Sequence, residues 1–449
     1  MLDQLVQPSV STILVKGNPG TGKSSLVLEL LRMQGKGTYV STRVSKESLA
    51  MHNPQVSLVV VGEQKVLRIG EARLGVEDYR LATEDQIVRT VFTKVKAEPG
   101  GLIVLDSWDS VAKELTPVER LQTEKAMVSV VQASDSKLVF VSEEPAMTTT
   151  DFLVDAIVEL SLELKHGYFR RWIETRKIRG QEITRPRRLF TLLNGKFKIM
   201  EPLEVRVPGQ YQPKQYVAVS GADGRYSSGV KDLDRLLGGG LLPGSSICLD
   251  HGSGIPPYSL LPFDLIIQSN FIASGGCVVS IPSAGISPDM VLGPLRAILP
   301  LTRVESSVRL GYFEKFSEPC TFTLDANAAD TTFSNLRKAI DGLKGASNRP
   351  CFIELGLDKL EYVHGKREVI KRVALEMTKA RGSGDVLLSI VGDFTESKGY
   401  ISAISDSHVM FESVNDTLTT QTLSPTGPIM AISYDYSAGF PAVSLTPIT

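Results

Sequence analysis

The chain carries one short segment whose residue types and spacing could bind phosphate groups. Positions 17–24 read G-x-x-x-x-G-K-S, the pattern of a phosphate-binding loop, or Walker A motif. In such loops backbone N–H groups surround the phosphates, a lysine reaches the β- and γ-phosphates, and a hydroxyl binds Mg²⁺. Lys23 and Ser24 are the candidates for the last two roles. The nucleotide-binding residues expected from this pattern are Gly17, Asn18, Pro19, Gly20, Thr21, Gly22, Lys23, Ser24 and Ser25.

The sequence on either side of this loop predicts the two elements that must hold it. Residues 12–15 are a short, mostly β-branched apolar run that is typical of a buried strand. Residues 25–33 are strong helix formers. A strand, a glycine-rich turn and a helix N-terminus together make an anion site, because the helix dipole favours negative charge there. We therefore expect ATP, with Mg²⁺, at this loop.

Composition and charge exclude several classes of protein. The chain is 42% hydrophobic and 22% charged, as in globular proteins, and its net charge of -1 attracts neither nucleic acid nor membranes. It has no apolar run long enough to cross a membrane and no signal-peptide pattern, so we expect a cytoplasmic protein with no membrane partner. The four cysteines and five histidines lack the spacing of a zinc site or a disulfide framework.

Strands and helices alternate through the first half of the chain. This alternation predicts a mostly parallel sheet flanked by helices on both faces. Asp106 ends one of the apolar strands and is, with Lys23, a candidate catalytic residue. The expected strands are residues 38–41, 56–61, 102–106 and 137–142, the expected helices are residues 84–96 and 117–133, and an antiparallel extension is expected from residues 157–160, 169–178 and 189–193.

The second half repeats this order of elements but lacks the chemistry of the loop. When Gly17 is aligned with Gly252, Lys23 falls on Tyr258 and Gly22 falls on Pro257. Proline has no backbone donor and tyrosine supplies no cation. We therefore predict a tandem duplication with three parts: an ATP-binding domain over residues 1–200, a linker over residues 201–225, and a degenerate domain without a working phosphate-binding loop over residues 226–449.

Several motifs give the chain a family resemblance. It resembles the RecA superfamily, in particular the KaiC-like ATPases and the related GvpD-like archaeal regulators, over nearly its whole length. This resemblance implies two tandem RecA-like (P-loop NTPase) domains, the second degenerate at its nucleotide site. The motifs that carry it are GNPGTGKS (residues 17–24), LIVLDSWDSV (residues 102–111), FLVDAIVEL (residues 152–160), RKIRG (residues 176–180) and GVKDLDRLLGGG (residues 229–240).

The resemblance also implies roles for individual residues. Asp106 would bind Mg²⁺ through water, together with Ser24. Lys177 and Arg179 match residues that reach across a subunit interface to the neighbour's γ-phosphate, which implies a homo-oligomer or a related RecA-like subunit as partner. The family carries acidic residues after its second strand, whereas this chain has Arg43 there. Without that acid to position water, we expect slow hydrolysis. Glu47, Glu143 and Glu144 could substitute for it, but the sequence does not place them.

These observations favour an ATP-binding regulatory or assembly protein with weak or no ATP hydrolysis, and with nucleotide in the N-terminal domain only. The alternative is a DNA-binding recombinase or repair paralogue of the RecA superfamily, in which the arginine-rich segment 170–188 contacts DNA. That segment interleaves aromatic and basic residues, but the charge of the whole chain is balanced, so a subunit interface or a solvated hairpin is the favoured interpretation. Trp108 could stack on a base, but a packing role is favoured for it.

Replacing Lys23 with alanine is expected to abolish nucleotide binding, because it removes the cation that the loop directs at the phosphates. Titration calorimetry with Mg·ATP measures this directly. An unchanged affinity for ATP in the Lys23→Ala protein would contradict the assignment of the site.

Overall fold

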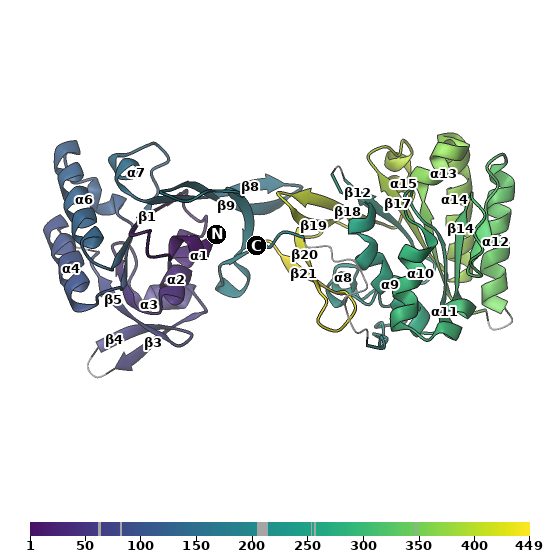
Figure 1. Ribbon diagram of the computed structural model, residues 1–449, viewed down its shortest axis with the longest axis horizontal. Helices are drawn as coiled ribbons and strands as arrows, with labels where there is room; N and C mark the ends of the chain where they lie inside the picture. The colour runs from purple at the N-terminus through teal and green to yellow at the C-terminus, as the bar shows by residue number, and fades with distance from the viewer. Residues whose placement is uncertain (62–63, 81–82, 204–213, 253, 256, 346–347) are drawn as a thin grey trace. The chain divides into compact units, whose positions relative to one another are not determined.

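The computed structural model describes residues 1–61, 64–80, 83–203, 214–252, 254–255, 257–345 and 348–449 (Figure 1). The chain forms two compact units. The first consists of Met1–Met200 together with Ile448–Thr449, and the second consists of Glu201–Pro447. Part of the predicted linker over residues 201–225, namely residues 204–213, lies outside the described residues.

The first unit contains a mixed sheet that is parallel at its centre. In chain order its elements are α1 (Leu2–Leu5), β1 (Thr12–Gly17), α2 (Lys23–Gln34), β2 (Gly37–Ser41), α3 (Lys46–His52), β3 (Val56–Val61), β4 (Gln64–Ile69), β5 (Ala72–Asp78), α4 (Glu84–Ala97), β6 (Leu102–Asp106), α5 (Asp109–Ala112), α6 (Pro117–Gln132), β7 (Lys137–Ser142), α7 (Thr149–Leu153), β8 (Ala156–Lys165), β9 (Tyr168–Ile178), β10 (Arg187–Thr191), η1 (Leu193–Gly195) and β11 (Lys198–Ile199).

The strand order of this sheet is β11-β10-β9-β8-β1-β7-β6-β2-β5-β4-β3. Strands β8, β1, β7, β6, β2 and β5 are parallel, and antiparallel pairs extend the sheet at both ends. The predicted antiparallel extension after residue 156 is present as β8 to β10. The β3–β4–β5 meander was not predicted beyond β3, because its strands are short and mix apolar with charged residues.

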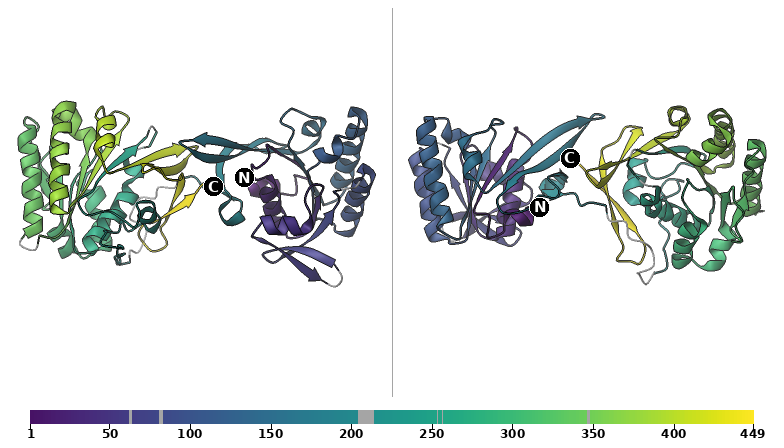
Figure 2. Two further views of the ribbon diagram at one scale, coloured as in Figure 1. Left: turned by 180° about the vertical axis from the view of Figure 1, so that it is seen from behind. Right: turned by 45° about the horizontal axis from the view of Figure 1, so that its top comes forward.

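Helices cover both faces of the parallel strands, as the alternating pattern predicts. Ile13 and Val15 of β1 pack with buried residues of α1, α2 and α3, whereas Leu14 packs with buried residues of α4 and α6. This alternation follows from the period of two along a strand. Figures 1 and 2 show α4 and α6 on the opposite side of the sheet from α1 and α2 in every view.

The second unit has the same architecture. In chain order its elements are α8 (Lys231–Leu236), β12 (Ser246–His251), η2 (Pro257–Ser259), α9 (Leu261–Ala273), β13 (Cys277–Ile281), α10 (Pro288–Ile298), α11 (Leu301–Ser307), β14 (Val308–Tyr312), β15 (Thr321–Thr323), α12 (Ala329–Lys344), β16 (Cys351–Gly356), α13 (Leu357–His364), α14 (Lys366–Ser383), β17 (Val386–Gly392), α15 (Lys398–Ile404), β18 (Ser407–Val414), β19 (Thr417–Ser424), β20 (Met430–Asp435) and β21 (Ala442–Pro447).

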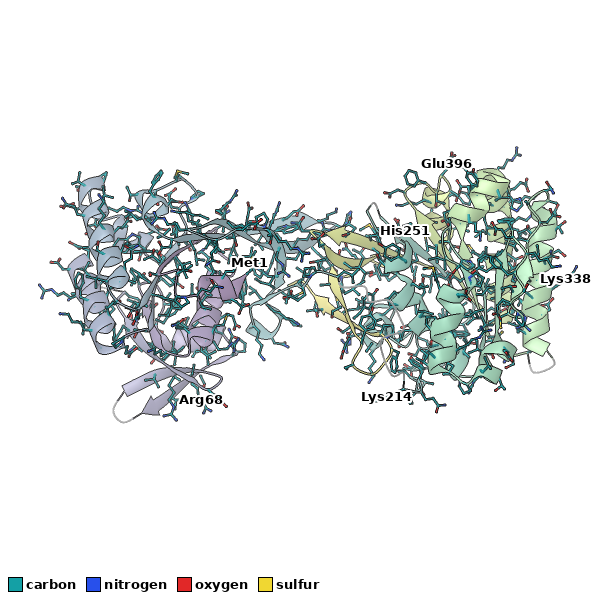
Figure 3. The ribbon with its side chains drawn as sticks, in the orientation of Figure 1. Met1, Arg68, Lys214, His251, Lys338 and Glu396 are labelled. Atoms are coloured by element: carbon teal, nitrogen blue, oxygen red, sulfur yellow. The ribbon has the colours of Figure 1, made fainter. Side chains whose placement is uncertain are left out.

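Its strand order, β15-β14-β13-β16-β17-β12-β18-β19-β20-β21, repeats that of the first unit at the centre of the sheet. Strands β13, β16, β17, β12 and β18 take the places of β2, β6, β7, β1 and β8. Helices α9 to α11 pack on one face and α12 to α14 on the other. In Figure 3 Lys338 lies on α12, at the outside of this unit, and His251 lies at the end of β12. Both units are therefore α/β domains built on largely parallel sheets.

One predicted strand differs slightly in its bounds from the observed strand. The strand expected at residues 189–193 is β10 (Arg187–Thr191), followed by a turn of 3₁₀ helix. Within the described part of the chain, no helix has the length and apolar character needed to cross a membrane.

A buried carboxylate ties the segment after β6 to the helix layer. Glu124 on α6 is fully buried and accepts hydrogen bonds from Trp108 Nε1 (2.8 Å), Arg120 Nε (2.9 Å) and the hydroxyls of Thr149 (2.7 Å) and Thr150 (2.6 Å). Trp108 is itself 1% exposed, so the favoured packing role is the one that it has in this structure.

Replacing Glu124 with alanine is expected to lower the free energy of unfolding of the first unit by about 3 kcal/mol, because several buried donors lose their acceptor. Urea denaturation followed by tryptophan fluorescence reports on this unit, since Trp108 and Trp172 are the two tryptophans of the chain. The control is Lys125→Ala on the exposed face of α6. Equal losses in the two variants would contradict the role given to Glu124.

Candidate phosphate-binding site

The loop over residues 17–22 connects β1 directly to the first turn of α2, which begins at Lys23. Gly17 has a φ of 151°, and a Cβ atom there would lie 2.5 Å from the carbonyl oxygen of Leu160. Gly22 has a φ of 105° immediately before the helix. The backbone can follow this path only with glycine at these two positions. The loop thus leaves an N-terminal helix turn and an exposed rim (residues 18–20) available to an anion.

Lys23 is folded into the loop that precedes it. Its Nζ donates hydrogen bonds to the carbonyl oxygens of Gly17 (2.7 Å) and Asn18 (3.0 Å), and its side chain is 7% exposed. Burial lowers the pKa of Lys23, although the nearby carboxylates of Glu143 and Asp106 oppose this shift. A cation held at the base of the loop in this way is the group that phosphate oxygens require.

Ser24 and Asp106 meet beside it, as the two sequence motifs predict. Ser24 Oγ donates a 2.7 Å hydrogen bond to Asp106 Oδ2 at the end of β6. The hydroxyl of Tyr39, on the neighbouring strand β2, donates to the same oxygen. Burial, together with the Asp106 carboxylate, raises the pKa of Tyr39 well above its usual value, so its hydroxyl stays protonated as a donor. A hydroxyl and a carboxylate side by side are the oxygen ligands that suit Mg²⁺.

An ion pair that the motifs do not contain closes this edge of the site. Glu143 lies directly after β7, and its Oε1 lies 2.5 Å from Arg43 Nη1 and 3.6 Å from Lys23 Nζ. Burial alone would raise the pKa of Glu143, but the hydrogen bond from Arg43 and the charge of Lys23 hold it below its ordinary value. The sequence contained one indication of this contact. Arg43 follows β2 and Glu143 follows β7, and residues that follow parallel strands of one sheet lie at the same edge of it.

Arg171, on β9, is a second residue at the loop whose role the sequence did not indicate. Its Nη1 donates to the carbonyl oxygens of Gly20 (3.1 Å) and Thr21 (3.3 Å), and its Nε donates to the carbonyl of Thr449, which belongs to the same unit. Burial lowers the pKa of Arg171. Arg171 therefore holds the outer half of the phosphate-binding loop in place.

Lys177 lies further along the same strand and Arg179 directly follows its end, away from the loop of their own chain. Lys177 Nζ donates to the carbonyl oxygen of Asp151 (2.9 Å). Arg179 Nη2 donates to the carbonyl oxygen of Phe152 (2.8 Å), and its Nη1 lies 3.4 Å from Asp155 Oδ1. Lys177 is six positions along the strand from Arg171, a span of about 20 Å. The structure thus brings neither residue to its own phosphate-binding loop.

The corresponding place in the second unit has a different chemistry. Leu355, which is buried, pairs with Ile281 at the end of the β13–β16 ladder, where Asp106 pairs with Ser41 in the first unit. Tyr258 lies in a 3₁₀ turn with its side chain exposed, and α9 begins only at Leu261. Positions 253 and 256 of the predicted degenerate loop lie outside the described residues.

Comparison with known proteins agrees with this geometry. Residues 2–204 match the family described as "ATPase: KaiC". The first unit is a KaiC-family ATPase domain. Over nearly its whole length, the chain is 25% identical to Protein GvpD2 and 22% identical to Protein GvpD1, both of Halobacterium salinarum. Each alignment covers 97% of this chain and 93% of the relative, so distant homology to GvpD proteins extends over nearly the whole chain.

A KaiC ATPase domain implies nucleotide binding, typically with Mg²⁺. The residues present fit such a ligand. Lys23 supplies a cation at the base of the loop, and Ser24 and Asp106 supply oxygen ligands. The resemblance that the sequence indicated is thereby confirmed at the level of fold and family.

Replacing Arg171 with alanine is expected to weaken ATP binding about fivefold, because the loop loses charge-assisted hydrogen bonds to two of its carbonyl groups. Calorimetry with Mg·ATP measures the change. The control is Arg176→Ala on the same strand, whose side chain pairs with Glu159 and Glu174 at the surface. An equal effect of both substitutions would show that ATP affinity depends on the positive charge of β9 and not on the contact between Arg171 and the loop.

Proposed function

We propose that this protein is a regulatory or assembly protein that binds Mg·ATP in its first unit and hydrolyses it weakly. The observation that carries the proposal is the convergence of Lys23, Ser24 and Asp106 at the N-terminus of α2. In this proposal residues 17–25 bind the phosphates, Lys23 neutralises them, and Ser24 and Asp106 hold Mg²⁺. A cytoplasmic location, as the sequence predicts, is part of the proposal.

Slow hydrolysis is supported by the contacts of the residues at the end of β2 and just beyond it. Ser41 Oγ donates to the carbonyl of Val44 (2.6 Å), Thr42 Oγ1 donates to the carbonyl of Ser107 (2.9 Å), and Arg43 is bound to Glu143. A cation therefore occupies the place where the family has an acid. Glu143 is the nearby carboxylate, and its lowered pKa makes it a weak proton acceptor.

Restriction of nucleotide to the first unit is supported by the second unit's own contacts. An apolar side chain, Leu355, stands at the register position of Asp106. The hydroxyl of Tyr434 donates to the carbonyl oxygen of Ser259 (3.1 Å), at the position that aligns with Ser24. In this proposal the second unit is a pseudo-ATPase that keeps the fold and has lost the phosphate site.

An assembly role is supported by the position of Lys177 and Arg179. Their distance from their own loop leaves them suited to a neighbouring subunit's nucleotide, as the KaiC resemblance implies. The γ-phosphate of ATP would then strengthen the contact between subunits, and its loss would loosen it. Regulation by ATP-dependent assembly follows from this arrangement.

The alternative function, a DNA-binding recombinase paralogue, is less well supported. Two arginines of segment 170–188 have partners within their own chain: Arg176 pairs with Glu159, and Arg187 stacks over Trp172 at 4.1 Å. Paired cations attract phosphates weakly. Salt-dependent binding of single-stranded DNA would favour this alternative.

Mg·ATP is expected to increase the mass of the wild-type protein in solution, because the terminal phosphate supplies a ligand for Lys177 and Arg179 of a second copy. Light scattering after size exclusion measures this with Mg·ATP, with Mg·ADP and without nucleotide. The Lys177→Ala/Arg179→Ala variant is expected to bind ATP but to keep the mass of the nucleotide-free protein.

Two results would contradict the proposal. Nucleotide-bound wild-type protein with unchanged mass would remove the assembly role. Rapid phosphate release in a hydrolysis assay, with or without DNA, would instead indicate an efficient ATPase.

A further inference from the structure

The phosphate-binding loop already has an anion beside it, and that anion belongs to the protein. Glu143 Oε1 lies 3.6 Å from Lys23 Nζ and 2.5 Å from Arg43 Nη1. The Lys23 side chain is almost fully buried, whereas those of Glu143 and Arg43 are 28% and 50% exposed. The carboxylate can therefore turn outward into solvent, whereas the lysine cannot leave the loop.

The position of Glu143 is held by its backbone. Its N–H donates to Asp109 Oδ2 (2.5 Å), and the same carboxylate accepts from Ser142 Oγ (3.0 Å). Asp109 is buried at the start of α5. The chain direction after β7 is thus fixed, and only the side chain of Glu143 is free to exchange its partners.

Carboxylates and phosphates are bound by the same cations in the same way. The family fold directs Lys23 toward the β- and γ-phosphates of a bound nucleotide. Arg43 Nη1 and Lys23 Nζ lie 2.5 Å and 3.6 Å from the same oxygen, Glu143 Oε1, so one anion is shared between the two cations. Neither can neutralise a terminal phosphate fully while it is paired with Glu143.

We propose that Glu143 competes with the terminal phosphate of a nucleoside triphosphate for Lys23 and Arg43, so that this pair sets the preference for triphosphate over diphosphate. This inference rests on the proposed nucleotide site. A triphosphate offers charge to both cations and displaces Glu143 from both. A diphosphate ends one phosphate earlier and leaves the Arg43–Glu143 pair intact. In this proposal Arg43 determines the specificity for triphosphate, and it contacts the nucleotide that is bound to its own chain.

The test measures the ratio of the dissociation constants for Mg·ADP and Mg·ATP by calorimetry. Replacing Glu143 with glutamine is expected to raise the preference for ATP about fivefold, because the competing charge is removed while the shape is kept. Replacing Arg43 with glutamine is expected to lower the affinity for ATP by a similar factor and to leave the affinity for ADP unchanged.

Glu144→Gln is the matched control. Glu144 is the next residue along the chain, and its carboxylate accepts a hydrogen bond from the backbone N–H of Ala146 (3.3 Å). Tryptophan fluorescence during thermal unfolding checks that each variant is folded. An unchanged ADP-to-ATP ratio in the Glu143→Gln and Arg43→Gln proteins would overturn this inference alone. A wild-type protein that binds neither nucleotide would instead overturn the proposed function.

Discussion

The first unit depends on one electrostatic constraint: a lysine side chain that is almost entirely removed from water. An isolated buried ammonium is costly, so it must be hydrogen-bonded and neutralised. Lys23 meets this requirement with two carbonyl groups of the loop and with the Glu143 carboxylate. The surrounding groups serve the same need, because they either hold the loop, as Arg171 does, or balance its charge, as Glu143 does.

The two units show how one scaffold behaves with and without this constraint. Their central strands have the same order and direction, so the carboxyl ends of corresponding strands meet at the same edge. In the first unit that edge carries Lys23, Asp106 and Glu143. In the second unit Leu355 occupies the position of Asp106, and the helix after the loop begins later, at Leu261. A parallel sheet thus persists without the residues of the phosphate site, because its core is apolar on both faces.

Much of the fold and part of the site could be predicted from sequence patterns. Apolar runs separated by helical segments predict the parallel strands, and the loop motif places Lys23 and Ser24 beside a helix start. Asp106 was predicted because it ends a buried strand. The β3–β4–β5 meander was missed because half-exposed strands carry a weak pattern. Arg171 was missed because nothing local distinguishes it from Arg176 or Arg179, which pair with Glu159 and Asp155 instead of the loop.

By itself, the sequence predicted phosphate-binding chemistry in the first half and the loss of that chemistry in the second half. Both depend on residue types within a few positions, where glycine permits the turn and lysine supplies the cation. Only the tertiary structure decided that Glu143 and Arg43 meet at Lys23, and that Arg171 holds the loop. These contacts join strands that are far apart in sequence, and register and sheet order, which fix such distances, are not local properties of the chain.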